Sequence, residues 1–430
     1  MLKITAQPRS SGYRINQSQK PKSIAFKGQS SLAINFKGQP KFNKEEPFVI
    51  TTDTAQMCGV RTTLQNLQRV GSEQGYNISV ITPDEFNHIR CPGYPDIRLA
   101  SLTPKNFFEL DKMLTQMNPQ SVFIATEGPM GMLAQLVCLK DKKPFTTAYT
   151  TKFPEYADEF LRKKARGLTQ QLGVPDEFLN MFRTLVPDEI LSPSLSAGLK
   201  QFHSKSSGVM VATETLRQDL RSQGYKNILP WTRGVDLASF SEKMRDSDFI
   251  PKSLNTVDKS KIKKPYLLYV GRVSEEKGLK DFLRLPSDLG TKIVVGDGPI
   301  LKELMQEFPD AIFTGRKKGE GLAKIYASSN LFVFPSKTDT FGVVMLESLA
   351  SGTPVAAYPV TGPIDVIGKN SNAGVLDNNL AKAVEKALKL DPKNCRAFAE
   401  KFSWENCFKM WLDNLAVISG KATKSLSRVA

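Results

Sequence analysis

Two acidic residues, Asp339 and Glu347, stand eight positions apart in the segment SKTDTFGVVMLESLASGTPVAA. Asp339 lies in a polar stretch after the apolar residues LFVF, whereas Glu347 is the one charged residue within the apolar run VVMLESLA. A carboxylate in an apolar helix needs hydrogen-bond donors to offset its removal from water. The diol of a ribose supplies such donors. A helix carboxylate that is satisfied by its own protein neighbours is the alternative.

The loop between these two acids predicts a site for an anion. The helix is expected to begin near Phe341, and the free N–H groups at the start of a helix attract negative charge. Thr340, Phe341, Gly342 and Val343 are therefore candidates to hold a phosphate group or sugar hydroxyl groups, with Asp339 beside them.

Two basic residues follow an earlier apolar segment. In YLLYVGRVSEEKG, Arg272 comes just past the strand-like residues and Lys277 comes five positions later. Two cations at the end of a strand suit the two phosphates of a diphosphate. Ordinary surface charge is the alternative, but Gly271 and Gly278 beside the pair favour a ligand, because glycine lets the backbone approach one closely.

Short apolar strands alternate with helical patterns along most of the chain. In the first half, FVITTDT, NISVITP, SVFIATEGP and PFTTAYTT have the pattern of strands, and the second half repeats the order with YLLYVGRV, TKIVVGDGP, AIFTG and LFVFPSK. Such alternation predicts two doubly wound α/β domains, each with a parallel sheet covered by helices. Paired domains of this kind hold a ligand in the crevice at the carboxyl ends of their strands.

Composition divides the chain into five parts. Residues 1–44 are rich in Ser, Gln, Lys and Gly, which indicates a disordered basic tail, with an organelle-targeting peptide as the alternative. A polar, lysine-rich stretch from 241 to 264 marks a domain boundary. The predicted parts are the tail at 1–44, an N-terminal domain at 45–240, a C-terminal domain at 241–404, a helix at 405–417 that is a candidate to pack back on the N-terminal domain, and a basic tail at 418–430.

The net charge of +16 comes mainly from the two tails. Residues 1–44 hold nine Lys or Arg, residues 418–430 hold three, and neither segment holds an acid. The folded body is thus only weakly basic, which argues against a nucleic-acid partner, although the tails would add attraction to anionic lipid. The two histidines exclude a histidine-rich metal site, and the five scattered cysteines, without a CxxC pair, indicate buried thiols in a reducing compartment.

Taken together, YVGRVSEEKG, VVGDGP, TDTFGVVMLESLASGTPVAA and TGPIDVIG resemble the retaining GT-B glycosyltransferases of the glycosyl transferase group 1 class. In the N-terminal half, TDTAQMCGVRTTL, IATEGPMG, FPEY and RGVD are similar to the branch that holds GDP-mannose-dependent α-mannosyltransferases and related lipid glycosyltransferases. The resemblance covers roughly residues 48–417. It implies an α/β GT-B fold, in which two Rossmann-like domains face each other across a cleft, with an acceptor-side N-terminal domain and a nucleotide-sugar-binding C-terminal domain.

The resemblance also implies roles for particular residues. Asp339 would face the donor sugar and its leaving group, Glu347 the ribose hydroxyl groups, and Arg272 and Lys277 the diphosphate. Gly59, in the first loop of the N-terminal domain, would let the backbone approach the phosphates and the acceptor. The fold needs no divalent metal and no cofactor beyond the donor substrate, which would be GDP-mannose or a UDP-hexose.

The implied function is transfer of a hexose, with mannose favoured, to an acceptor hydroxyl group of a lipid or cell-envelope glycan. The enzyme would be cytoplasmic and a candidate for the inner face of the membrane. The basic cluster at 162–166 fits an anionic membrane surface and equally a solvated helix face.

One position departs from the family pattern. Thr150 stands where the branch usually has a histidine near the reacting sugar, and neither His88 nor His203 can be assigned to that place. This departure favours, as an alternative, a catalytically impaired nucleotide-sugar-binding scaffold. A UDP-sugar 2-epimerase of the same fold is a second alternative, which the TDTFG segment and the Arg–Lys pair disfavour.

Overall fold

Two parallel sheets organise the protein in this computed structural model, which describes residues 42–53, 59–91, 94–150, 188–253, 262–368 and 371–418. The first sheet has the order β2(Ile78–Ile81), β1(Phe48–Thr51), β5(Ser121–Ile124), β6(Phe145–Tyr149), β7(Gly208–Val211) and β8(Ile228–Pro230). The second has the order β11(Ile312–Phe313), β10(Thr291–Val295), β9(Tyr266–Val270), β12(Leu331–Phe334), β13(Val355–Ala357) and β14(Gly374–Leu376). A two-stranded hairpin, β3(His88–Cys91) and β4(Tyr94–Ala100), is antiparallel.

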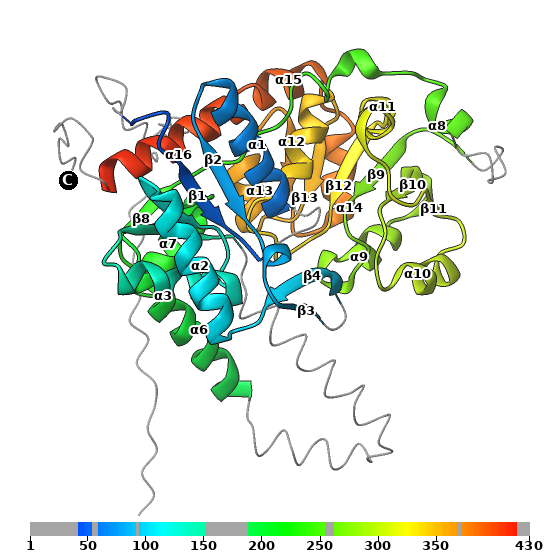
Figure 1. Cartoon of the computed structure of the whole chain (residues 1–430). Coiled ribbons are helices and arrows are strands. Elements are labelled where there is room, and N and C mark those ends of the chain that lie inside the picture. The colour runs from blue at the N-terminus through cyan, green and yellow to red at the C-terminus, as the bar shows by residue number, and fades with distance from the viewer. Residues whose placement is uncertain are drawn as a thin grey trace, which may run out of the picture. The chain divides into compact units, whose positions relative to one another are not determined.

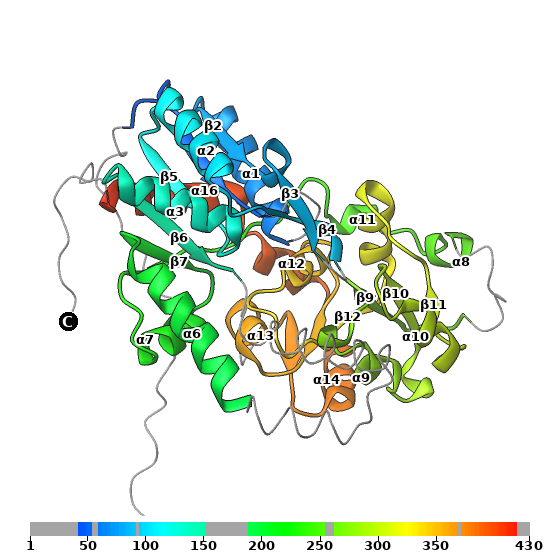
Figure 2. The ribbon, with the colours of Figure 1, turned by 60° about the horizontal axis from the view of Figure 1, so that its bottom comes forward.

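The strands of both sheets are buried, as their sequences require. β1, β6, β7, β9, β12 and β13 have no exposed residue, because helices cover both faces of a parallel sheet. Their short apolar runs are therefore continuous rather than alternating. The neighbouring strands β5, β6 and β7 run side by side in Figure 2, so the loops that follow them leave the same edge of the sheet.

Helices alternate with the strands in chain order (Figure 1). Those that follow the strands of the first sheet are α1(Gly59–Glu73), α2(Pro104–Met117), α3(Pro129–Lys140), α6(Asp188–Ser204), α7(Glu214–Ser222) and α8(Phe249–Ser253). Those that follow the strands of the second sheet are α9(Leu279–Leu283), α10(Leu301–Glu307), α11(Gly319–Ser328), α12(Val343–Ala350), α13(Thr361–Val366), α14(Leu380–Ala387), α15(Lys393–Ala399) and α16(Trp404–Ile418). In the described part of the chain, no helix combines the length and the apolar character that a membrane crossing needs.

The last helix packs against the core of the first sheet, although it follows the second sheet in the chain. α16 lies beside α1 (Figure 1), and its Phe408 and Trp411 belong to the same buried cluster as Phe48 of β1. The rings of Phe48 and Trp411 are 5.5 Å apart between centroids. Large aromatic side chains bury much apolar surface, so α16 ties the end of the second half to the first.

Candidate functional site

The loop that carries Asp339 runs from β12 into α12. The helix begins at Val343 rather than near Phe341, so Glu347 stands about one turn inside it instead of two. Gly342 precedes the helix with φ 83°, which is left-handed backbone that favours glycine. A Cβ on Gly342 would lie 2.7 Å from the terminal methyl of Met345. The turn into α12 therefore depends on this glycine.

Glu347 is held by a tyrosine that the sequence did not single out. The hydroxyl group of Tyr326, a fully buried residue of α11, donates a hydrogen bond to Glu347 Oε2 over 2.9 Å. Burial raises the pKa of the Glu347 carboxyl to about 7, and the bond from Tyr326 acts in the opposite direction. Among the described residues, no hydrogen bond to Glu347 Oε1 is found. That oxygen is available to a ligand hydroxyl group.

Lys277 and Asp339 meet across the loops that follow two neighbouring strands, β9 and β12. The Lys277 ammonium lies 2.6 Å from Asp339 Oδ1, and the two side chains are 20% and 21% exposed. A pair this short and this little exposed is stronger than an ion pair on the open surface. The structure thus brings together one cation and one acid that the sequence analysis placed in the same site.

Arg272 lies in a loop whose shape depends on three glycines. The Tyr269 hydroxyl group donates a hydrogen bond to the Arg272 carbonyl over 2.8 Å. A Cβ on Gly296 would lie 1.8 Å from the Gly271 carbonyl oxygen, and one on Gly298 would lie 2.2 Å from the carbonyl oxygen of Val273. The loops after β9 and β10 therefore touch backbone to backbone. The glycines of VVGDGP serve this contact as well as a turn.

Replacing Gly298 by alanine is expected to force these two loops apart and to lower the free energy of unfolding by about 1–3 kcal/mol, as an overpacked site does. Urea denaturation measures the change. The control is Gly321→Ala in α11, where a Cβ would meet nothing within 4 Å. That variant should be as stable as the parent or more stable by up to ~1 kcal/mol, because alanine favours a helix. Equal stability of the two variants would contradict the backbone contact.

Thr340 joins the loop of Asp339 to the first sheet. Its hydroxyl group donates a hydrogen bond to the Thr150 carbonyl over 2.9 Å, and the Thr213 hydroxyl group donates to the Thr340 carbonyl over 3.3 Å. Thr150 follows β6, so the contact reaches the carboxyl end of that strand. His203 packs against the same strand with its Nδ1 2.9 Å from Thr147 Oγ1, and it is fully buried.

Gly59 and the basic cluster remain apart from this group. Gly59 is the first residue of α1, it is exposed, and a Cβ there would meet open space. Within the described ranges, no hydrogen bond links it to Lys277 or Asp339. The cluster at 162–166 and the FPEY segment lie outside the described residues. In those same ranges, no group of three or more His, Cys, Asp or Glu is placed to hold a metal ion.

The second half of the chain matches a known protein family. Residues 254–402 fit the family described as Glycosyl transferases group 1. This range contains Arg272, Lys277, Asp339, Tyr326 and Glu347, so the group built above lies within it.

Two relatives and one solved structure are similar over longer stretches. The chain is 27% identical over 338 residues to the sulfoquinovosyl transferase SQD2 of Arabidopsis thaliana, which covers 74% of this chain and 60% of the relative. It is 37% identical over 181 residues to a GDP-mannose-dependent alpha-mannosyltransferase of Corynebacterium glutamicum, covering 42% of each. The matches thus span less than two thirds of both relatives. The structure of Anabaena Alr3699/HepE in complex with UDP and glucose has a TM-score of 0.59 at 14% identity and covers 86% of this chain and 98% of that one.

The fold and family that the sequence predicts are confirmed. Two parallel sheets with alternating helices, together with the similarity to HepE, establish the GT-B fold. The family match establishes the resemblance to the group 1 glycosyltransferases. Tyr326 is the residue of the site that sequence reasoning missed, because only its place on the buried side of α11 brings it to Glu347.

Proposed function

We propose, from the premise that the chain belongs to the GT-B glycosyltransferases through its glycosyl transferases group 1 domain, that it moves a hexose from a nucleoside-diphosphate sugar to an acceptor hydroxyl group. The observation that carries the proposal is the position of the Lys277–Asp339 pair, 2.6 Å apart, in loops after two adjacent parallel strands. Ligands of open α/β sheets bind at that edge.

In the proposed reaction, the bond between the sugar C1 and the diphosphate oxygen breaks, and a bond from C1 to the acceptor oxygen forms on the same face. Positive charge develops on the sugar and negative charge on the departing diphosphate. Lys277 and Arg272 stabilise the diphosphate as that charge grows. The leaving phosphate accepts the proton of the acceptor hydroxyl group, so the step balances without a histidine at position 150.

Lys277 exchanges partners when the donor binds. With no ligand present, its ammonium contacts Asp339. An incoming phosphate competes for this ammonium, which leaves Asp339 to accept a hydrogen bond from a sugar hydroxyl group. Glu347 accepts hydrogen bonds from the ribose through Oε1 while Tyr326 holds Oε2. Each acid thus has one task, and the two tasks lie about one helical turn apart.

The proposed donor is GDP-mannose, with a UDP-hexose as the second candidate. The first choice follows the name of the corynebacterial relative, which is the more identical of the two, and the second follows the UDP and glucose bound to HepE. The proposed acceptor is a lipid or cell-envelope glycan, reached from the inner face of an anionic membrane. Exposed apolar side chains on α2 and α3 support a lipid surface, namely Phe108, Met132, Leu136 and Leu139.

A transfer assay tests donor and acceptor together. The protein is incubated with radiolabelled GDP-mannose or UDP-glucose, and with either anionic vesicles that contain diacylglycerol or a soluble oligosaccharide. Label from GDP-mannose in the organic phase is the expected result. Label in the soluble glycan would replace the lipid acceptor, label from UDP-glucose would replace the donor, and donor binding without transfer or hydrolysis would favour the scaffold that Thr150 suggests.

A further inference from the structure

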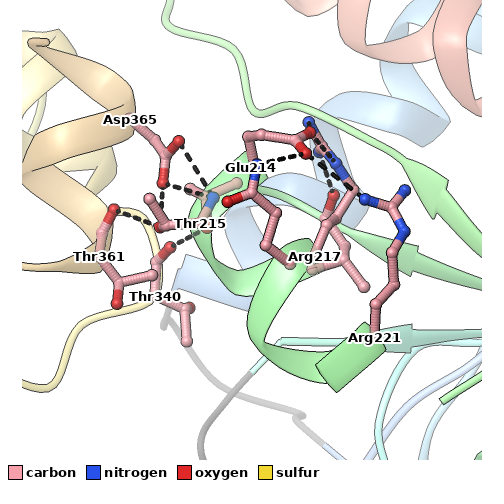
Figure 3. Close-up of polar contacts among 10 residues, drawn as sticks. Glu214, Thr215, Arg217, Arg221, Thr340, Thr361 and Asp365 are labelled. Carbon is pink, nitrogen blue, oxygen red and sulfur yellow. Dashed lines mark hydrogen bonds and ion pairs between the residues drawn. The ribbon is translucent and has the colours of Figure 1, made fainter. Parts of the chain in front are cut away.

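Helix α7 of the first half receives its N-terminal cap from the second half. Its own N-cap residue, Thr213, makes no side-chain cap. Instead, Asp365 of α13 accepts hydrogen bonds from the Thr215 N–H, which lies 3.3 Å from Oδ1 and 3.2 Å from Oδ2. The Thr215 hydroxyl group also donates to Asp365 Oδ2 (Figure 3). The first N–H groups of a helix need acceptors, and here a residue 150 positions away supplies one.

The same region holds the loop of Asp339. Thr213, whose hydroxyl group would otherwise cap α7, donates to the Thr340 carbonyl over 3.3 Å. Thr340 in turn donates to the Thr150 carbonyl at the end of β6. Figure 3 places Thr340 and Thr361 on the side of Asp365, with Thr215 between them and α7. We call Asp365, Thr215, Thr213 and Thr340 the clasp, because they join the two halves through side chains.

The clasp is asymmetric in its charges. Asp365 is the acid that crosses between the halves, whereas Glu214, the adjacent acid on α7, bonds only within its own helix, to Arg217, Gln218 and Arg221. Burial raises the pKa of the Asp365 carboxyl, and its bonds with Thr215 oppose that rise. A carboxyl group that is costly to bury is poor material for stability alone. Its place one turn from the Thr340 contact suits a positioning role better.

We propose that Asp365 is a positioning residue, which caps α7 across the two halves and thereby holds Thr340, and with it Asp339, against the carboxyl end of β6. This inference rests on the proposed glycosyl transfer and deepens it. Nucleoside diphosphate binding uses Arg272, Lys277 and Glu347 of the second half and does not require the clasp. Transfer does require it, because the acceptor must meet the sugar where the two halves touch.

The test compares Asp365→Ala with Glu214→Gln, a change of the neighbouring acid that leaves the clasp intact. Asp365→Ala is expected to lower kcat for transfer roughly 10- to 100-fold, as small displacements of reacting groups do. The dissociation constant for the nucleoside diphosphate should change less than about threefold, and a larger share of donor should be hydrolysed by water. Asp365→Asn, which keeps an oxygen acceptor for Thr215, should recover most of the lost kcat. Glu214→Gln should match the parent in all three.

Hydrogen–deuterium exchange gives a readout that does not depend on activity. In Asp365→Ala, amides of 213–217 and 338–342 should exchange faster, whereas Glu214→Gln should leave 338–342 unchanged. Unchanged exchange at 338–342 in Asp365→Ala would overturn the clasp even if the parent protein transfers no sugar. Loss of nucleotide binding in step with kcat would also overturn it, since that result indicates a general structural role. Parent protein that binds no nucleotide would instead contradict the proposed function.

Discussion

Lys277→Ala is expected to lower the turnover of sugar transfer by about two to three orders of magnitude, with the fold retained. Lys277 supplies the cation closest to Asp339, and charge stabilisation of a departing group is often the largest protein contribution to such a reaction. The side chain is mostly covered, so little solvent competes with it. Arg272→Ala should act in the same direction, because Arg272 belongs to the same loop.

The control for this prediction is Lys280→Ala, a lysine three positions along whose ammonium pairs with Glu303 over 2.8 Å and Glu307 over 3.0 Å on the surface. Surface pairs contribute little, so its turnover should stay within about twofold of the parent. Steady-state kinetics and a circular dichroism melt of each variant check both points. Turnover that is unchanged in Lys277→Ala, or lost equally in Lys280→Ala, would sink the role given to Lys277.

Glu347→Gln is expected to weaken nucleoside diphosphate binding about tenfold above pH 7 and to remove most of its pH dependence. The pKa of Glu347 is raised from 4.5 to about 7 by burial. A carboxylate accepts two O–H donors of a ribose, whereas the protonated acid keeps one oxygen occupied by its own proton. In the parent protein, affinity should therefore rise between about pH 6 and pH 8. Titration calorimetry across this range measures it.

The stability of the unliganded protein should show the opposite trend. The folded pKa of Glu347 lies above the unfolded value, so the folded state binds the extra proton. Stability is then highest below about pH 4.5 as far as this group is concerned, and it is lost as the pH rises toward about 7. Glu347→Gln removes this loss. Glu320→Gln, which changes an exposed acid paired with Lys324, is the control, and a parent-like pH profile in Glu347→Gln would contradict the ribose role.

Sequence reasoning reached the fold because a local pattern determines it. Continuous apolar strands such as YLLYV and LFVF, separated by helical patterns, leave a parallel sheet covered on both faces as the natural arrangement. The pairing of β9 with both β10 and β12 follows from that arrangement. Lys277 and Asp339 were placed in one site for the same reason, since loops after neighbouring parallel strands leave the same edge of a sheet.

The parts that sequence reasoning missed depend on contacts between distant segments. The start of α12 was set two residues early, because the left-handed φ of Gly342 delays the helix and no local propensity reveals it. Tyr326 reaches Glu347 from another helix, and Asp365 caps a helix 150 residues away. No spacing rule links such positions in one sequence.

The most direct measurement is a thermal shift of the parent protein and of Lys277→Ala with GDP, UDP and ADP, in the presence of EDTA. The account predicts that one nucleotide raises the melting temperature of the parent by about 2–5 °C at a concentration well above its dissociation constant. It also predicts that Lys277→Ala loses this shift while melting near the parent temperature without ligand. No shift with any nucleotide, or an equal shift in both proteins, would contradict a diphosphate site built on Lys277.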